Sequence, residues 1–199
     1  MKKEVGERVG EVACWDEFRA GSLEAFTALY NTHVRALYSY GRKFTPDADL
    51  VEDCIQDLFV ELWKKREGLG PTDSAKYYLF AALRNRIIRQ KQTAARRTAE
   101  TFPEEDEFEI TLSPEASLIN DQVTREQQLY LEQALGKLTR RQREAIYLKF
   151  FECLSYDEVA RVMQLELRSV YNLVSKAIET LKHNAPKVLT ACLLLLLGG

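Results

Sequence analysis

The sequence predicts an all-α protein in which two small helical domains are joined by an acidic linker. Its 199 residues include only 9 Gly and 5 Pro, which leaves little material for the turns of an all-β fold. Apolar residues recur with helical three-and-four spacing on both sides of a segment, residues 98–121, that shows no clean period. Because that segment holds eight acids and no base, it is expected to be a linker.

The first domain is expected over residues 22–95, after an N-terminal extension of residues 1–21. Ser22 can cap a helix that runs to about Phe44. The apolar spacing gives this helix one buried face. Its expected members are Phe26, Leu29, Tyr30, Val34, Leu37, Tyr38 and Phe44.

A second helix is expected from a capping-box-like pair, Asp49 with Glu52, to about Arg66. After a loop that contains Gly and Pro, a third helix follows over residues 75–92. Three helices of this length can form a small bundle. The expected core positions are Val51, Cys54, Ile55, Leu58, Phe59 and Leu62 in the second helix and Leu79, Leu83 and Ile87 in the third.

The linker is expected over residues 96–121 and a second domain over residues 122–185. Thr139 can cap a helix of that domain, which runs to about Phe151. The helix before it would bury Tyr130, Leu131, Ala134, Leu135 and Leu138.

A helix-turn-helix follows. Ser155 with Glu158 forms a capping box for a short helix to Met163, and a tight turn leads into a longer helix that ends near Lys182. A short helix, a turn and a longer helix is the geometry of motifs that enter the major groove of DNA. Polar side chains on the outer face of the longer helix suit phosphates and base edges. We expect DNA contacts from Arg168, Ser169, Tyr171, Asn172, Ser175 and Lys176.

A basic segment covers residues 76–97, where seven Lys or Arg and no acid occur. Aromatic residues are interleaved with them, which suits contact with a single-stranded backbone and base stacking worth about 1–3 kcal/mol per base. The alternative is a solubilising surface, with some of the aromatics in the core. The candidate nucleic-acid contacts are Lys76, Tyr77, Arg84, Asn85, Arg86, Arg89 and Lys91.

No enzymatic, metal or cofactor site is expected. The four cysteines are far apart and form no CxxC pair, and His33 and His183 are isolated. The N-terminus lacks the apolar stretch of a signal peptide, so a cytoplasmic protein is expected. The apolar tail within residues 186–199 is too short to span a membrane. It is expected to pack on the second domain, with a docking surface for the first domain or for a partner as the alternative.

Three segments resemble the extracytoplasmic-function (ECF) sigma factors of bacterial RNA polymerase. Residues 51–63 (VEDCIQDLFVELW) are similar to the family's polymerase-binding helix, often written AEDLVQEVFLRLW. Residues 75–91 (AKYYLFAALRNRIIRQK) are similar to its promoter-melting helix. Residues 138–160 (LTRRQREAIYLKFFECLSYDEVA) are similar to its LPERQREVFLLRYFEGLSYEEIA segment. The two modules stand in the family's order.

The resemblance implies a sigma region 2-like first domain that binds core RNA polymerase and opens the promoter. It also implies a region 4-like second domain that binds the minus-thirty-five element. The loop after Arg66 and the helix from Lys76 would capture an unpaired base, and the acidic linker would either run through the active-site channel or act as a spacer. The chain is expected to be a monomer when free and to have an anti-sigma factor. The resemblance implies that the clamp helices of the largest polymerase subunit bind Glu52, Asp53, Gln56, Asp57, Phe59 and Trp63.

Some positions depart from the family pattern. Cys153 and Gln164 replace glycines, one after a helix and one in the turn, so the local backbone is expected to differ. Glu166 stands where the family often has a capping Ser, and Leu173 and Ile178 stand where it often has cations.

Two other functions remain open at this point. The acidic residues around Asp53 could be only the solvated face of an amphipathic helix. The chain would then be a helix-turn-helix regulator that binds operators without polymerase. A sigma-like adaptor, which binds polymerase but does not start transcription, is the other alternative.

Overall fold

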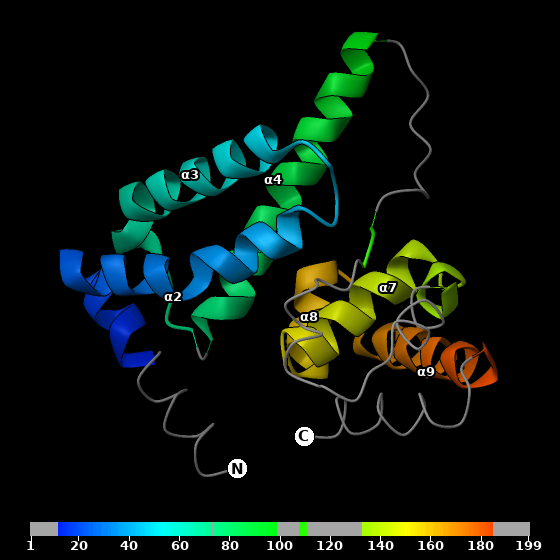
Figure 1. The fold of residues 1–199 in the computed structure, drawn as a ribbon. Coiled ribbons are helices and arrows are strands. Elements are labelled where there is room, and N and C mark those ends of the chain that lie inside the picture. Colours follow the sequence, from blue (N-terminus) through cyan, green and yellow to red (C-terminus); the bar gives the residue numbers. More distant parts are fainter. Residues whose placement is uncertain (1–11, 73, 99–107, 111–132, 185–199) are drawn as a thin grey trace, which may run out of the picture. The chain divides into compact units, whose positions relative to one another are not determined.

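A computed structural model describes residues 12–72, 74–98, 108–110 and 133–184 (Figure 1). Every regular element in these ranges is helical, which confirms the predicted all-α class. The chain divides into two compact units, Met1–Phe102 and Pro103–Gly199. No helix in the described ranges is long and apolar enough to cross a membrane.

The first unit contains α2 (Leu23–Gly41), α3 (Ala48–Lys65), a 3₁₀ turn η1 (Arg66–Gly68) and α4 (Ala75–Thr98). The three α-helices pack against one another in pairs (Figure 1). The end of α2 comes very close to α3, because a Cβ at Gly41 would lie 2.6 Å from a Val51 methyl group. This close approach is open only to glycine.

The caps of the first unit are partly as predicted. Ser22 caps α2, since its hydroxyl accepts a hydrogen bond from the Ala25 N–H. The predicted Asp49 cap of α3 is wrong: α3 is capped by Asp47, whose carboxylate accepts from the Leu50 N–H at 3.0 Å. The spacing of Asp49 to Glu52 favoured the wrong one of two aspartates near the same helix start.

Burial in the first unit follows the predicted stripe fully on α3 and in part on α2, where Leu29 and Leu37 are buried as predicted. All six predicted core positions of α3 are buried. On α2 the buried line passes through Ala25, Leu29, His33 and Leu37, whereas Tyr30 is 38% exposed. Of the predicted aromatic residues, Phe44 is buried and Tyr30 is not, and the core also takes up Ala25 and His33, which were not predicted there.

The N-terminal extension contributes to the core of the first unit. Residues 12–19 form a helix, hereafter the N-terminal helix, in which Trp15 and Phe18 are 1% and 0% exposed. The third predicted helix is also longer than expected, because α4 continues to Thr98. Its predicted core residues, Leu79, Leu83 and Ile87, are fully buried.

The second unit contains α7 (Arg140–Ile146), a π-helical segment η2 (Tyr147–Phe151), α8 (Tyr156–Met163) and α9 (Leu167–Asn184). The capping boxes at Thr139 and Ser155 are both complete. Their reciprocal hydrogen bonds fix where α7 and α8 begin. The helix expected before Thr139 is described from residue 133 on, and Ala134, Leu135 and Leu138 are buried as predicted. The earlier part of that helix and the apolar tail lie outside the described residues.

The backbone at the two replaced glycines keeps the conformation that glycine favours. Cys153 and Gln164 both have φ of 55°. The expected local difference in geometry is therefore wrong, because the hydrogen bonds around each turn hold the chain there. At Gln164 these include Leu165 N–H to Ala160 O at 2.9 Å. A side chain in this left-handed region costs about 1 kcal/mol relative to glycine.

Part of the acidic segment belongs to the second unit's core. Residues 108–110 are described, and Phe108 is fully buried with its ring edge-on to Tyr147 at 5.8 Å. Ile110 is 9% exposed. The stretch was predicted to be linker, because two apolar residues among acids show no helical or strand period.

Candidate protein-binding and nucleic-acid interfaces

The polar face of α3 is exposed and acidic. Glu52, Asp53, Gln56 and Asp57 all lie on the surface. They sit opposite the buried stripe, because residues one, four and five positions apart share a helix face. Five buried aliphatic and aromatic neighbours on the other side of α3 keep this face fixed in orientation. The four side chains therefore lie together on one exposed face.

Two of the predicted contact residues on α3 are not on that face. Phe59 is 3% exposed and meets Tyr30 edge-on at 4.9 Å. Trp63 is half-buried, with its ring 5.0 Å from Phe26 and the Arg66 guanidinium 4.6 Å from its centroid. Phe59 therefore supports the acidic face from the core in this structure.

One residue of the face was missed in the sequence. Val60 is 52% exposed and follows Gln56 and Asp57 by four and three positions, so it lies on the same side of α3. The sequence could have indicated Val60, because it is an apolar residue that falls outside the buried stripe and next to the acids.

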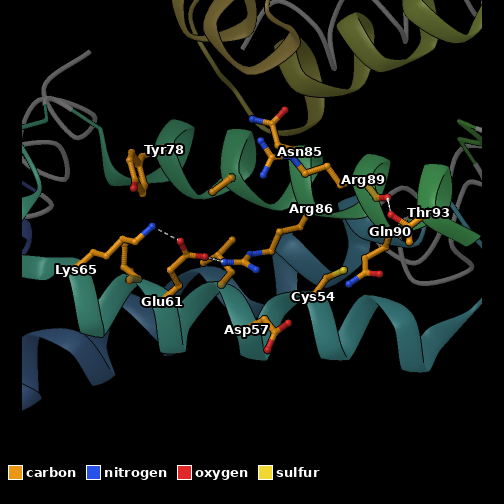
Figure 2. A pocket seen from close by; sticks show the side chains of 13 residues that line it. Cys54, Asp57, Glu61, Lys65, Tyr78, Asn85, Arg86, Arg89, Gln90 and Thr93 are labelled. Atoms are coloured by element: carbon orange, nitrogen blue, oxygen red, sulfur yellow. Dashed lines mark hydrogen bonds and ion pairs between the residues drawn. The ribbon is translucent and has the colours of Figure 1, made fainter.

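Residues of the neighbouring helices α3 and α4 line a groove of about 550 Å³ (Figure 2). Asp57 and Glu61 line it from α3, and Asn85, Arg86 and Arg89 line it from α4. The α3 wall of the groove also carries Lys65 beside its two acidic groups, and the α4 wall carries two arginines.

Glu61 connects the two walls of this groove. Its carboxylate forms ion pairs with Arg86 of α4 and with Lys65 one turn further along α3 (Figure 2). Hydrogen bonds from Lys65 and Arg86 lower the pKa of Glu61. Arg86, predicted to contact nucleic acid, is placed to hold α4 against α3.

The other predicted residues of α4 do not form one continuous face. Lys91 donates a hydrogen bond to the Phe44 carbonyl at 2.7 Å, and the Lys76 ammonium lies 5.7 Å from the centre of the Phe80 ring. Tyr77, Arg84 and Asn85 are half-buried, and Arg89 is exposed.

A buried histidine lies behind this surface. His33 is 6% exposed. Burial, with a smaller contribution from the positive charge of Lys76, lowers the pKa of His33 to about 4. The first unit therefore holds His33 in its neutral form at neutral pH.

The outer face of α9 matches the prediction in position. Its inward side, with Val170, Val174 and Ala177, is buried against the rest of the second unit. All six predicted DNA contacts are exposed, namely Arg168, Ser169, Tyr171, Asn172, Ser175 and Lys176.

Tyr171 is held in place by a stack that the sequence did not reveal. Its ring, 49% exposed, stacks on Tyr156 of α8 at 4.3 Å between centroids. The Lys149 ammonium lies 4.9 Å from the Tyr156 ring centre and donates to the Leu154 carbonyl at 3.1 Å. These residues come from three different elements, so only the folded chain brings them together.

The described residues contain no cluster of three or more His, Cys, Asp or Glu side chains that could hold a metal ion. The acidic face of α3 is a row along one helix, which suits contact with a surface.

Two family models match the chain. The model for sigma-70 region 2 matches residues 29–97, which include α3 and α4 up to its last residue. The model for sigma-70 region 4 matches residues 128–181, which include the helix-turn-helix.

Curated relatives match most of the chain. The ECF RNA polymerase sigma factor SigL of Mycobacterium tuberculosis is 25% identical over 156 residues, which are 78% of this chain and 85% of SigL. The ECF RNA polymerase sigma factor SigX of Bacillus subtilis is 26% identical over 171 residues, covering 83% of this chain and 82% of SigX.

Two solved structures share the fold. RpoE of Bartonella quintana, solved in complex with the anti-sigma factor NepR, aligns with a TM-score of 0.59 at 22% identity and covers 81% of this chain and 96% of that one. CnrH, solved with the cytosolic domain of CnrY, aligns with a TM-score of 0.58 at 22% identity and covers 87% and 95%.

Proposed function

The chain belongs to the ECF sigma factors of the sigma-70 family, and from this membership we propose how its residues divide the work of the family. It binds core RNA polymerase and directs promoter recognition, promoter opening and transcription initiation. The family consists of transcription regulators. The chain itself has no catalytic step in this proposal and acts beside polymerase in the cytoplasm.

The exposed acidic face of α3 carries the proposal. In this account Asp53, Gln56 and Asp57 contact the clamp helices of the largest polymerase subunit, and Val60 supplies an apolar contact beside them. The exposed Val60 side chain would contribute by losing its contact with water when a partner covers it. The polar groups give orientation and specificity.

α4 and the loop before it would bind the melted promoter strand. The support is the exposed Arg89 and the half-buried Tyr77, Arg84 and Asn85 at the surface of one helix. Cationic and aromatic side chains together suit a single-stranded backbone and its bases. Arg86 acts in this account through its ion pair with Glu61, which keeps α4 at a fixed distance from α3.

α9 would read the double-stranded upstream element. Arg168, Ser169 and Asn172 lie in its first turns, where backbone N–H groups also face a ligand. Arg and Asn can form bidentate hydrogen bonds with guanine and adenine edges in the major groove. The stacked Tyr171 would add an apolar contact at a fixed position.

Run-off transcription with core polymerase on genomic promoter fragments tests the function. The chain should give discrete initiation sites, and core polymerase alone should not. Binding assays separate the two alternatives. An operator-binding regulator would bind DNA tightly without polymerase, and an adaptor would bind polymerase without supporting any initiation. Folded protein that gives no specific initiation would contradict the proposal.

An anti-sigma factor is part of the proposed biology. RpoE is solved with one, and this chain shares its fold. Such a partner would compete with core polymerase for the first unit. Competition would appear as loss of the core complex when the candidate partner is added.

A further inference from the structure

The N-terminal helix is joined to the loop after α3 by two hydrogen bonds. The Trp15 indole N–H donates to the Gly70 carbonyl at 3.1 Å, and Arg19 Nε–H donates to the Leu69 carbonyl at 2.7 Å. The acceptors are consecutive carbonyl groups, although the partners are 55 and 50 residues apart in sequence. The helix therefore fixes the path of the 66–72 loop, by which we mean residues 66–72.

The side chains of Trp15 and Arg19, which donate these hydrogen bonds, are themselves held by other contacts. Trp15 is 1% exposed, and its ring contacts Phe18 at 5.4 Å and Tyr78 of α4 at 5.2 Å. The Arg19 guanidinium forms an ion pair with Asp16 at 3.0 Å. The loop and the first turn of α4 are thus held by the same residue, Trp15.

The angle of the N-terminal helix is set by a glycine turn. Gly21 has φ of 99°, and its N–H bonds the Phe18 carbonyl at 2.9 Å. The Ser22 N–H bonds the Glu17 carbonyl at 3.0 Å. This turn ends the N-terminal helix, which lies against the 66–72 loop through Trp15 and Arg19.

The other described hydrogen bonds of the 66–72 loop are local, among them Leu69 N–H to the Arg66 carbonyl at 3.2 Å, the Arg66 guanidinium to the Trp63 carbonyl at 2.9 Å and the Thr72 hydroxyl to the Ser74 carbonyl at 3.1 Å. Cβ atoms at Gly68 and Gly70 would meet nothing within 4 Å. Ordering one flexible residue costs about 1–2 kcal/mol, so a loop that is already ordered binds its ligand more tightly.

We propose that Trp15 and Arg19 are positioning residues for promoter opening. They hold the backbone of the 66–72 loop in the conformation that accepts an unpaired promoter base. Neither side chain touches DNA, and both act through the Leu69 and Gly70 carbonyls. The inference rests on the proposed role of the first unit in binding the melted strand.

The test uses polymerase holoenzyme assembled from the full chain. The probe is a single-stranded oligonucleotide from the melted region of a promoter mapped by run-off transcription, compared with the same oligonucleotide carrying one substituted base. The ratio of the two affinities measures discrimination. Arg19→Gln and Trp15→Phe should each lower this ratio about three- to ten-fold, the effect of losing one hydrogen bond. Affinity for core polymerase should stay unchanged.

Arg19→Lys separates geometry from charge. It keeps the positive charge but loses the planar Nε–H, so it should lower the ratio as much as Arg19→Gln. A wild-type ratio for Arg19→Lys would indicate a direct charge contact with DNA and overturn the inference. Arg35→Gln removes an exposed arginine from α2 and is the matched control, with no expected change.

Amide hydrogen exchange of the free chain tests, without DNA, whether the N-terminal helix orders the 66–72 loop. Exchange in the 66–72 loop should rise in Arg19→Gln while α3 and α4 exchange as in the wild type. Unchanged exchange and an unchanged ratio in both Arg19→Gln and Trp15→Phe would overturn the inference. A wild-type holoenzyme that shows no discrimination, with the loop still protected in the free chain, would instead refute the proposed strand-binding role of the first unit.

Discussion

α3 and α9 are both helices of 18 residues with one buried side, yet they present different surfaces. α3 exposes a row of acids with Val60 beside them, whereas α9 exposes hydroxyl, amide and cationic groups with one stacked tyrosine. An acidic row repels the phosphate backbone, so it suits a protein partner, while donors at a helix start suit DNA. Two helices of equal length thus carry exposed side chains that suit different kinds of partner.

The two helices also differ in how they are supported. α3 is fixed by its fully buried stripe and by the Glu61–Arg86 ion pair to α4. α9 follows a turn with a left-handed Gln164, and its exposed Tyr171 rests on Tyr156. Substitutions can therefore change one interface while leaving the other intact.

Asp57→Arg is expected to have the largest effect. Reversing a charge within a complementary interface costs about 2–5 kcal/mol, so affinity for core polymerase should fall at least about thirty-fold. The measurement is a titration of labelled chain with core polymerase. Glu179→Arg, with the same charge change on α9, should bind core normally. Normal core binding by Asp57→Arg would move the contact away from this face.

The buried His33 predicts that the first unit loses stability in acid. Its pKa is about 4 in the folded chain and near 6.5 when unfolded, so the unfolded chain takes up the proton first. The stabilisation is complete above pH 6.5 and is lost as the pH falls toward 4, by about 3 kcal/mol in total.

Chemical denaturation at pH 7 and at pH 5 measures this loss. His33→Gln is the comparison, because it removes the titrating group and leaves the carboxylates in place. Wild type should lose more stability than His33→Gln over this interval. Equal losses in the two proteins would show that His33 does not titrate with folding.

Substitutions on α9 are expected to act on promoter choice. Arg168→Ala and Asn172→Ala should each weaken promoter use by about 1–3 kcal/mol if the side chain makes a bidentate base contact. Affinity for core polymerase should be unchanged. Promoter titration with the assembled holoenzyme gives the measurement. Unchanged promoter use by both variants would mean that another face of α9 reads the DNA.

The smallest expected effect is in the turn before α9. Gln164→Gly should raise the free energy of unfolding by about 1 kcal/mol, because glycine adopts a φ of 55° without strain. Cys153→Gly should behave similarly. Thermal or chemical unfolding measures both. A loss of stability would indicate that the side chain at the position makes a compensating contact.

Local patterns were enough to predict most helices. The capping box at Ser155 and the stripe on α3 are confirmed, because each depends on residues within one or two turns. The same reasoning failed at the start of α3, where the spacing of Asp49 and Glu52 matched a capping box but Asp47, two residues earlier, caps the helix.

Long-range packing was not predictable from these patterns. Trp15 and Phe108 lie outside the expected helices, and both are buried by residues distant in sequence. Arg86 was grouped with the nucleic-acid contacts because of its charge, and only the fold places it beside Glu61. The exposed faces of α3 and α9 were predicted in position because a buried stripe also defines the side opposite to it.

The central claim is that α3 provides the polymerase contact and α9 the promoter contact. Holoenzyme formation and promoter selectivity measured side by side for Asp57→Arg and Asn172→Ala test it most directly. The account predicts that Asp57→Arg fails to form holoenzyme, while Asn172→Ala forms it normally and loses promoter selectivity. If Asn172→Ala lost core binding, or if Asp57→Arg formed holoenzyme and lost only selectivity, the division between the two helices would be contradicted.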